Sequence, residues 1–196
     1  MPHSERPALR LDRHGWLKAS PGVSLAPSPN FDSRPAQQDA YLLVLHNISL
    51  PPGQFGGTEV VDFFQNKLDY STHPWLERLR EMRVSAHFFI RRDGGIVQCV
   101  STLDRAWHAG VSSFEERERC NDFSIGIELE GTDTLPYTDA QYLSLQRLIP
   151  VLRTRHPLRA VRGHEHIAPG RKTDPGPAFD WKRFGKENGI ARRLLP

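Results

Sequence analysis

Unbroken hydrophobic runs predict the strands in the first half of the chain. Residues 41–45 are apolar without interruption, which is typical of a strand buried on both faces, and His46 and Asn47 follow at once. A second strand is predicted at residues 84–90 and a return strand at residues 96–100, because two glycines in the short segment between them favour a hairpin turn. The first buried strand therefore carries polar side chains at its C-terminal end.

Residues 123–130 alternate strictly between apolar and polar positions, as expected for a strand with two different faces. The apolar face holds Phe123, Ile125, Ile127 and Leu129, and the other holds Ser124, Gly126, Glu128 and Glu130. Two carboxylates on a face of small residues lie either in water or in a pocket, and this segment alone favours neither.

Three helices are predicted from periodicity and capping residues. One follows Thr58 over residues 59–65, and a short one covers residues 180–184. The longest begins at a capping box in residues 138–141. Its apolar positions have helical spacing: Tyr142, Leu145, Ile149 and Leu152. Pro150 lies within this helix and lacks a backbone donor, so we expect a kink or a pause there.

The length of 196 residues favours one domain, and neither repeats nor a linker interrupt it. The predicted elements indicate the α/β class, with one mixed central β-sheet flanked by helices. Residues 1–40 are rich in proline, serine and arginine and predict an extended lead-in. We expect loosely ordered tails at about residues 1–15 and 187–196 of this single domain.

Charge is distributed unevenly. From Arg153 onward there are 11 Lys/Arg and 4 Asp/Glu, although the formal net charge of the chain is only +3. This basic end favours an anionic partner, and carboxylates on a small substrate would suit it as well as phosphates. No basic run is interleaved with aromatic residues, so a nucleic-acid partner is not expected.

The N-terminal segment and the cysteines bear on cellular location. No apolar run follows the first charges, so no secretory signal is expected, and the stretch 41–45 is too short to span a bilayer. Cys99 and Cys120 form no CxxC pattern and are interpreted as reduced thiols, with a single disulfide as the less favoured alternative. We therefore expect a cytoplasmic protein without a membrane partner.

The segment 162–177 concentrates the candidate chemistry. It contains His164, His166, Lys172 and Asp174 among three prolines and three glycines, a composition that predicts almost no regular structure. Stiff loops rich in ligand side chains are frequently functional, although a plain surface loop explains the composition equally well.

A hydrolytic zinc site needs three protein ligands and one open position. His46, His164 and Asp174 would supply such a set from two distant parts of the chain. His166 competes with His164, because side chains two residues apart on an extended segment point the same way.

The nine histidines fall into three groups. We interpret His3, His14, His73 and His156 as surface residues, and His87 as a buried, hydrogen-bonded imidazole within a strand. The remaining four lie where strands end or loops begin, which is the usual place for chemistry: His46, His108, His164 and His166.

Five blocks, in unbroken order, resemble those of a known enzyme family. They are Leu45-His46-Asn47 through Gly53, residues 84–88, Arg105-Ala106-Trp107-His108 through Ser112, residues 120–134, and Gly163-His164 through Trp181. The chain resembles the N-acetylmuramoyl-L-alanine amidase and peptidoglycan recognition protein family, in particular the cytoplasmic zinc amidases that cut 1,6-anhydro-N-acetylmuramyl-L-alanine bonds in peptidoglycan recycling. The resemblance spans about residues 16–184 and implies the family's mixed sheet flanked by helices.

The resemblance also implies roles for individual residues. His46, His164 and Asp174 become ligands of one zinc ion per chain, Glu128 the catalytic acid/base and Lys172 the stabiliser of the transition state. The residues that it places around a small muropeptide substrate are Asn47, Arg83, Trp107, His108 and Arg119. One departure is Glu165-His166 where the family commonly has Cys-Asp, so a switched ligand stays open. We expect a monomer.

Two alternative functions are weighed against muropeptide recycling. An endolysin-type amidase acting on intact cell wall would share the same chemistry. A non-catalytic peptidoglycan-binding module would be expected to lack a ligand or the catalytic pair, whereas all five residues are present here.

Overall fold

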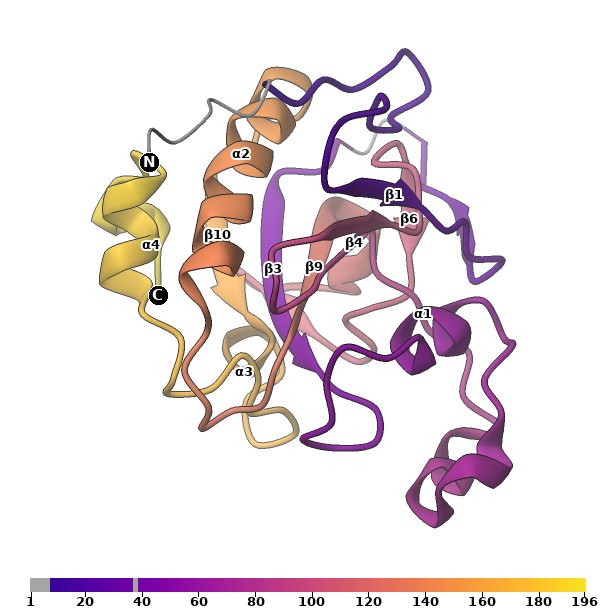
Figure 1. The fold of residues 1–196 in the computed structure, drawn as a ribbon. Coiled ribbons are helices and arrows are strands. Elements are labelled where there is room, and N and C mark those ends of the chain that lie inside the picture. Colours follow the sequence, from indigo (N-terminus) through magenta and orange to yellow (C-terminus); the bar gives the residue numbers. More distant parts are fainter. Residues whose placement is uncertain (1–7, 37–38) are drawn as a thin grey trace, which may run out of the picture.

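A six-stranded mixed sheet forms the centre of the computed structural model, which describes residues 8–36 and 39–196 (Figure 1). The strands, in spatial order, are β1 (Val23–Leu25), β5 (Ile96–Gln98), β4 (Phe88–Ile90), β9 (Ser124–Glu130), β3 (Leu42–Ile48) and β10 (Ala160–Gly163). Strands β4 and β5 are antiparallel, and all other neighbours in this sheet are parallel. This confirms the predicted fold class.

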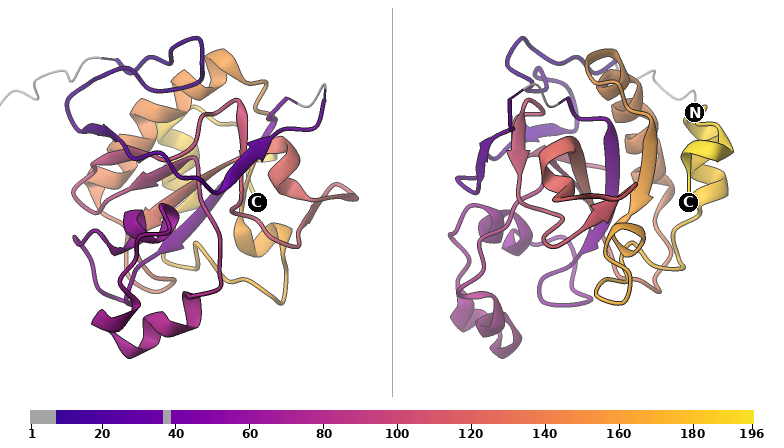
Figure 2. Two further views of the ribbon diagram at one scale, coloured as in Figure 1. Left: turned by 90° about the vertical axis from the view of Figure 1, so that its right-hand side faces the viewer. Right: turned by 180° about the vertical axis from the view of Figure 1, so that it is seen from behind.

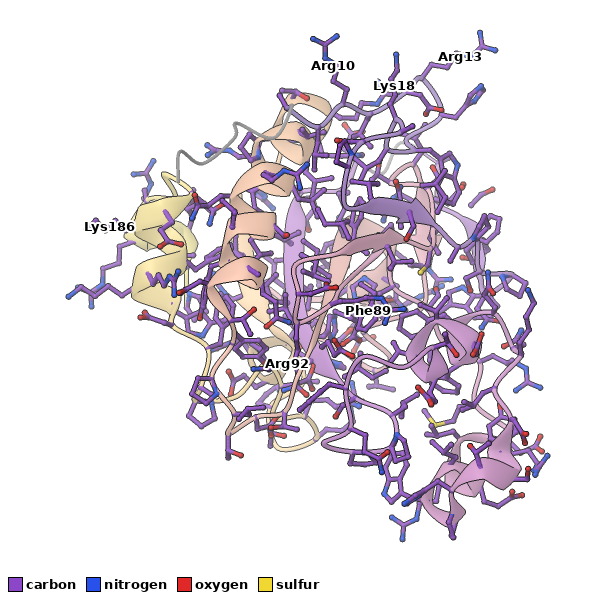
Figure 3. The ribbon with its side chains drawn as sticks, viewed as in Figure 1. Arg10, Arg13, Lys18, Phe89, Arg92 and Lys186 are labelled. Carbon is purple, nitrogen blue, oxygen red and sulfur yellow. The ribbon has the colours of Figure 1, made fainter. Side chains whose placement is uncertain are left out.

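Helices cover both faces of the sheet (Figures 1 and 2). Helices α2 (Asp139–Arg155) and α4 (Trp181–Glu187) pack on one face, against a core that includes Leu43 and Leu45 of β3 and Ile125 and Ile127 of β9. The opposite face carries α1 (Glu59–Phe64) and a 3-10 helix at Pro74–Leu79, which enclose a second core around Phe89. Figure 3 shows Phe89 inside the molecule, whereas Arg10, Arg13 and Lys18 project from the N-terminal segment into solvent.

The pairing of β3 with β9 places two candidate residues side by side. The parallel register joins Leu42 to Ser124 and His46 to Glu128. Because side chains alternate along a strand, the apolar partners Leu43, Leu45, Ile125 and Ile127 face the α2 side while His46 and Glu128 face the other. The alternation in residues 123–130 thus marks a pocket rather than a solvated face, since Glu128 is largely buried and Glu130 fully so.

Smaller elements complete the fold. They are β2 (Phe31–Ser33) paired with β6 (Asp104–Ala106), β7 (Ser113–Phe114) paired with β8 (Arg117–Glu118), α3 (His164–Ile167), and 3-10 helices at Tyr70–Thr72, Cys120–Phe123 and Arg192–Leu194. Leu9 and Leu195, which lie in the segments expected to be loose tails, pack against the main core. Within the described ranges, no helix is long and apolar enough to cross a membrane.

Several predictions of local structure are confirmed. The hairpin joins β4 to β5 with Gly94 at a φ of +86°, and the capping box of α2 forms between Thr138 and Gln141. Asp180 caps α4 by accepting from the backbone N–H of Arg183. Both cysteines are free and buried, as expected for reduced thiols.

Other predictions are wrong or incomplete. The strand predicted at residues 84–90 is limited to β4, and α2 continues through Pro150 instead of pausing. The Thr58 hydroxyl binds the Asp62 carboxylate rather than capping the backbone of α1. His156 is buried, not on the surface, because it lies where α2 ends against the body of the protein. His3 lies outside the described residues.

Candidate active site

Three candidate ligand atoms converge at the C-terminal edge of the sheet. The Nδ1 atoms of His46 and His164 lie 3.0 Å apart, and each lies 3.1 Å from Oδ2 of Asp174. Within the described part of the chain, this trio is the one group of histidine, cysteine and carboxylate side chains close enough to hold a metal ion. The hypothesis that distant segments meet here is therefore supported by direct geometry.

Parallel strands place the two imidazoles. His46 lies near the end of β3, and His164 is the first residue of α3, immediately after β10, the strand next to β3. Contrary to the expectation of irregular loop, residues 164–167 form one helical turn. His166 therefore points away from His164, and its Nδ1 accepts from the backbone N–H of Gly163 at 3.0 Å. This removes the competition between the two histidines.

The donor set fits a zinc ion. Four-coordinate zinc with bonds of about 2.0–2.1 Å has ligand atoms about 3.3 Å apart, close to the observed triangle. The Nε2 of His164 lies 3.0 Å from the carbonyl oxygen of Ala109, which can only accept a hydrogen bond. The His164 ring therefore carries its proton on Nε2, and the lone pair of its Nδ1 faces the candidate metal centre. Two neutral imidazoles and one carboxylate are ligands that zinc prefers.

Electrostatics favour the ligand-competent protonation states. Burial, followed by the neighbouring His164, lowers the pKa of His46 to about 4, so its ring is neutral at neutral pH. Burial alone would raise the pKa of Asp174, but the close imidazoles of His164 and His46 outweigh burial and hold that pKa well below its usual range. The site therefore presents one negative charge.

Glu128 lies beside this trio. Its Oε1 is 3.9 Å from Nδ1 of His46, and Oε2 is buried without a hydrogen-bond partner in the structure. Desolvation, and then the negative charge of Asp174, raise the pKa of Glu128 well above its ordinary value. A carboxylate with raised proton affinity and a free oxygen is suited to accepting a proton from a group in the cavity.

Specific hydrogen bonds hold the turn that carries Asp174. The carbonyl of Asp174 accepts from the backbone N–H of Glu165 at 2.9 Å. The carbonyl of Pro175 accepts from the Asn47 amide at 3.2 Å and from the Tyr137 hydroxyl at 2.8 Å. Gly176 has a φ of +78° and lies so close to Asp133 that a Cβ would come within 2.5 Å of its Cα. Only glycine fits there.

A cavity of about 390 Å³ opens over these groups. Its polar lining includes Asn47, His108, Glu128 and Lys172 in addition to the candidate ligands His164 and Asp174. One wall is apolar and comes mainly from α1 and the 3-10 helix at Pro74–Leu79: Leu50, Phe63, Phe64, Trp75, Leu79, Met82 and Val84. Trp107 also lines the cavity. The site can thus hold a ligand with polar and apolar parts.

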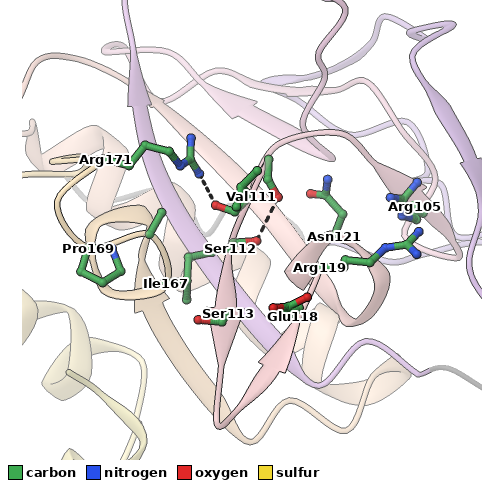
Figure 4. A pocket seen from close by; sticks show the side chains of 12 residues that line it. Arg105, Val111, Ser112, Ser113, Glu118, Arg119, Asn121, Ile167, Pro169 and Arg171 are labelled. Carbon is green, nitrogen blue, oxygen red and sulfur yellow. Dashed lines mark hydrogen bonds between the residues drawn. The ribbon is translucent and has the colours of Figure 1, made fainter.

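The two expected arginines lie outside this cavity. Arg83 is exposed, and its guanidinium donates to the carbonyls of Arg80 and Met82, both at 2.9 Å. Arg119 lines a separate, wider pocket of about 760 Å³, where its side chain extends towards Arg105 and away from Arg171 (Figure 4). Its Nε lies 3.5 Å from Oδ2 of Asp122. The side chain of Arg119 stays 70% exposed.

Sequence reasoning missed several residues that shape the site. Tyr137 and Asn121 act through hydrogen bonds to backbone groups far along the chain, and nothing in their local sequence signals this. Ser124 carried a signal, because the alternating pattern places it on the same face as Glu128, and its hydroxyl contacts His108. The apolar wall was also missed, although Phe63 and Phe64 lie in the helix predicted at residues 59–65.

Comparison with known proteins identifies the family. The profile of the N-acetylmuramoyl-L-alanine amidases matches residues 37–177, more than half of the chain. The chain belongs to the N-acetylmuramoyl-L-alanine amidase family. This amidase is 58% identical over 172 residues to the 1,6-anhydro-N-acetylmuramyl-L-alanine amidase AmpD of Citrobacter freundii, covering 87% of this chain and 90% of that relative.

Solved structures agree with this placement. A crystal structure of a selenomethionine derivative of AmpD superposes with a TM-score of 0.86 at 55% identity, covering 90% of this chain and 98% of that one. The Escherichia coli amidase AmiD, solved with anhydro-N-acetylmuramic acid-L-Ala-D-γ-Glu-L-Lys, gives a TM-score of 0.56 at 26% identity, over 94% of the amidase described here and 66% of AmiD. The chain is therefore an enzyme, an N-acetylmuramoyl-L-alanine amidase.

Proposed function

We propose that this amidase hydrolyses the amide bond between N-acetylmuramic acid, in its 1,6-anhydro form, and L-alanine of small muropeptides during peptidoglycan recycling. The observation that carries the proposal is the convergence of His46, His164 and Asp174 within 3.1 Å of one another beside the unpaired carboxylate of Glu128. The high identity to AmpD supports the anhydro-muropeptide as the substrate. A cytoplasmic location and a monomeric state belong to the same proposal.

His46, His164 and Asp174 would hold one zinc ion per chain. Bound there, zinc supplies Lewis acidity that polarises the scissile carbonyl and makes water reactive at neutral pH. The protein supports this by orienting both imidazoles and by burying them, since His46 and His164 are almost fully enclosed. A water-poor site strengthens every electrostatic interaction within it.

Glu128 is the proposed acid/base. Its free oxygen accepts the proton of the attacking water, and its raised pKa lets it keep that proton until the alanine nitrogen leaves. The same proton then goes to that nitrogen, so the amine departs as a neutral group. General acid–base catalysis of this kind contributes about 10²–10⁴ in rate.

Lys172 is proposed to stabilise the oxyanion that develops on the carbonyl oxygen. It lines the same cavity as Glu128 and His164. Its backbone N–H donates a hydrogen bond to the carbonyl of Ala168 at 3.0 Å, in the turn that follows α3, and this fixes its position. Removing one such donor commonly costs about 10²–10³ in kcat.

The remaining residues would bind the muropeptide. Asn47 and Trp107 line the cavity, with the indole offering a face to the sugar or the peptide. Arg83 and Arg119 are positioned outside it, where their guanidinium groups would attract carboxylates of a stem peptide that extends from the cavity.

The decisive experiment compares two substrates. We expect release of peptide from anhydro-muropeptide and little release from whole sacculi. Purified protein should contain about one zinc per chain, and chelation should abolish turnover until zinc is restored. Preferential action on sacculi would instead indicate the endolysin-type activity, and zinc binding without turnover on either substrate would indicate a binding module.

A further inference from the structure

Hydrogen bonds and close packing fix the position of His108 in the cavity wall. Its backbone N–H and that of Ala109 donate to the side-chain oxygen of Asn121 at 3.1 and 2.8 Å. Its ring packs directly on Gly126 of β9, where a Cβ would lie 2.4 Å from Cγ of the imidazole. Any side chain at position 126 would collide with the ring of His108, so the glycine allows this close packing.

Both ring nitrogens of His108 are occupied within the protein. Its Nδ1 lies 2.9 Å from Nε2 of His46, and its Nε2 lies 3.1 Å from the hydroxyl oxygen of Ser124. The other nitrogen of His46 is the one that faces His164 and Asp174. Ser124, His108 and His46 thus form a continuous chain of hydrogen bonds that ends at the candidate metal centre.

With both rings neutral, the protons along this chain of hydrogen bonds can be arranged in only two ways. In the first, His46 donates from Nε2 to His108, and His108 donates from Nε2 to Ser124, so Nδ1 of His46 keeps a free lone pair. In the second, Ser124 donates to His108, and His108 donates from Nδ1 to His46, so the proton of His46 sits on Nδ1. Both orders leave the two rings neutral, but only the first permits a metal bond at Nδ1.

We infer that His108 is a positioning residue for the metal centre, which accepts the Nε2–H of His46 and passes its own Nε2–H to Ser124, and thereby fixes His46 as an Nδ1 ligand. The inference rests on the proposed function, because it assigns His108 a role towards the zinc site. Outer partners that orient a ligating histidine commonly change metal affinity by about 10–100-fold when they are removed.

Burial supports this arrangement of hydrogen bonds. His108 is 8% exposed and Ser124 fully buried, so water does not compete for these hydrogen bonds. A neutral ring at position 108 has one donor and one acceptor, as the first order requires.

The test measures zinc affinity by competition with a chromophoric chelator, using zinc alone as the probe. His108→Phe keeps a ring but no acceptor, and we expect zinc to bind about 10–100-fold more weakly. His108→Asn keeps a side-chain oxygen near the position of Nδ1 and should restore most of the affinity. His156→Phe makes the same change at a buried histidine that does not line the cavity, and it should leave zinc affinity unchanged.

A second measurement does not depend on whether the variants fold. Long-range ¹H–¹⁵N spectra of the zinc-loaded wild-type protein should show His46 and His108 each protonated on Nε2 and not on Nδ1. Protonation of His108 on Nδ1, or wild-type zinc affinity in His108→Phe, would overturn the inference. Failure of the wild-type protein to bind zinc at all would instead refute the proposed function.

Discussion

The two halves of the active site are built by different means. His46 and Glu128 stand on β3 and β9, whose continuous ladder pairs these two residues directly. His164, Lys172 and Asp174 come from the segment after β10, where a single helical turn and individual hydrogen bonds replace the ladder. The strand side is therefore fixed by cooperative backbone pairing, and the loop side depends on a few contacts that single substitutions can remove.

This difference suggests that substitutions on the strand side change chemistry without loss of structure. Glu128→Gln keeps the shape of the side chain and removes its ability to accept a proton. We expect kcat on anhydro-muropeptide to fall by about 10²–10⁴ while zinc content stays near one per chain. Steady-state kinetics and metal analysis check this together, and a kcat close to the wild-type value would exclude Glu128 from the proton transfer.

His156, at the end of α2, lies outside both halves of the active site and provides a reference for the pH dependence of stability. Burial, followed by the charge of Arg34, lowers the pKa of His156 to about 4 from an ordinary 6.5. As pH falls from about 6.5 to 4, the unfolded chain binds a proton at this residue and the native protein does not. The free energy of unfolding should therefore fall by up to about 1.4 kcal/mol per pH unit, with no contribution above that window.

Urea unfolding at several pH values measures this slope. His156→Phe lacks the titrating group, so its stability should decline less steeply over the same range than that of the wild-type protein. Identical slopes for the two proteins would show that His156 takes up its proton equally readily in the folded state.

On the loop side, a matched pair of glycines separates crowding from backbone strain. Gly170 and Gly176 have similar φ angles of +75° and +78°, but nothing lies within 4 Å of a Cβ at Gly170, whereas Asp133 blocks one at Gly176. Gly170→Ala should cost about 1 kcal/mol of stability through strain alone. Gly176→Ala should cost about 1–3 kcal/mol more and weaken zinc binding, because the turn that carries Asp174 must shift.

Thermal unfolding and zinc titration of the two variants give the comparison. Equal losses in both would mean that the contact between Gly176 and Asp133 does not set the position of the turn.

The smallest expected effect concerns one hydrogen bond. Tyr137→Phe removes the donor to the Pro175 carbonyl but keeps the ring packed against Phe179, 5.5 Å away. Because Asn47 still donates to the same carbonyl, we expect a loss of about 1 kcal/mol in the free energy of unfolding and little change in kcat. A large loss of activity would mean that Asn47 alone cannot hold the turn.

The same contrast explains how much of the molecule could be predicted from its sequence. The elements β3, β9, the β4–β5 hairpin and the start of α2 follow from local patterns of apolar residues, glycines and capping groups. Zinc chemistry pointed to the residue types of the candidate ligands, and the family resemblance favoured His46, His164 and Asp174, but the sequence left His166 open as an alternative to His164. Their meeting point in the structure agrees with that choice.

The parts that could not be predicted depend on partners distant in sequence. The pairing of β2 with β6 joins residues more than seventy positions apart, and β1 reaches the sheet edge only through β5. The burial of His156 and the helical turn at residues 164–167 likewise arise from packing that no local pattern records. The expectation of a shared direction for His164 and His166 failed for this reason.

The register between β3 and β9 fixes both the packing of the core and the positions of the candidate catalytic side chains. A slip of one position would send Glu128 to the side covered by α2 and bring Ile127 towards the imidazoles. A chain with this shifted register would lose both the packing of its hydrophobic core and its catalytic activity. A substitution that leaves this register intact therefore also keeps the candidate catalytic side chains of these two strands in place.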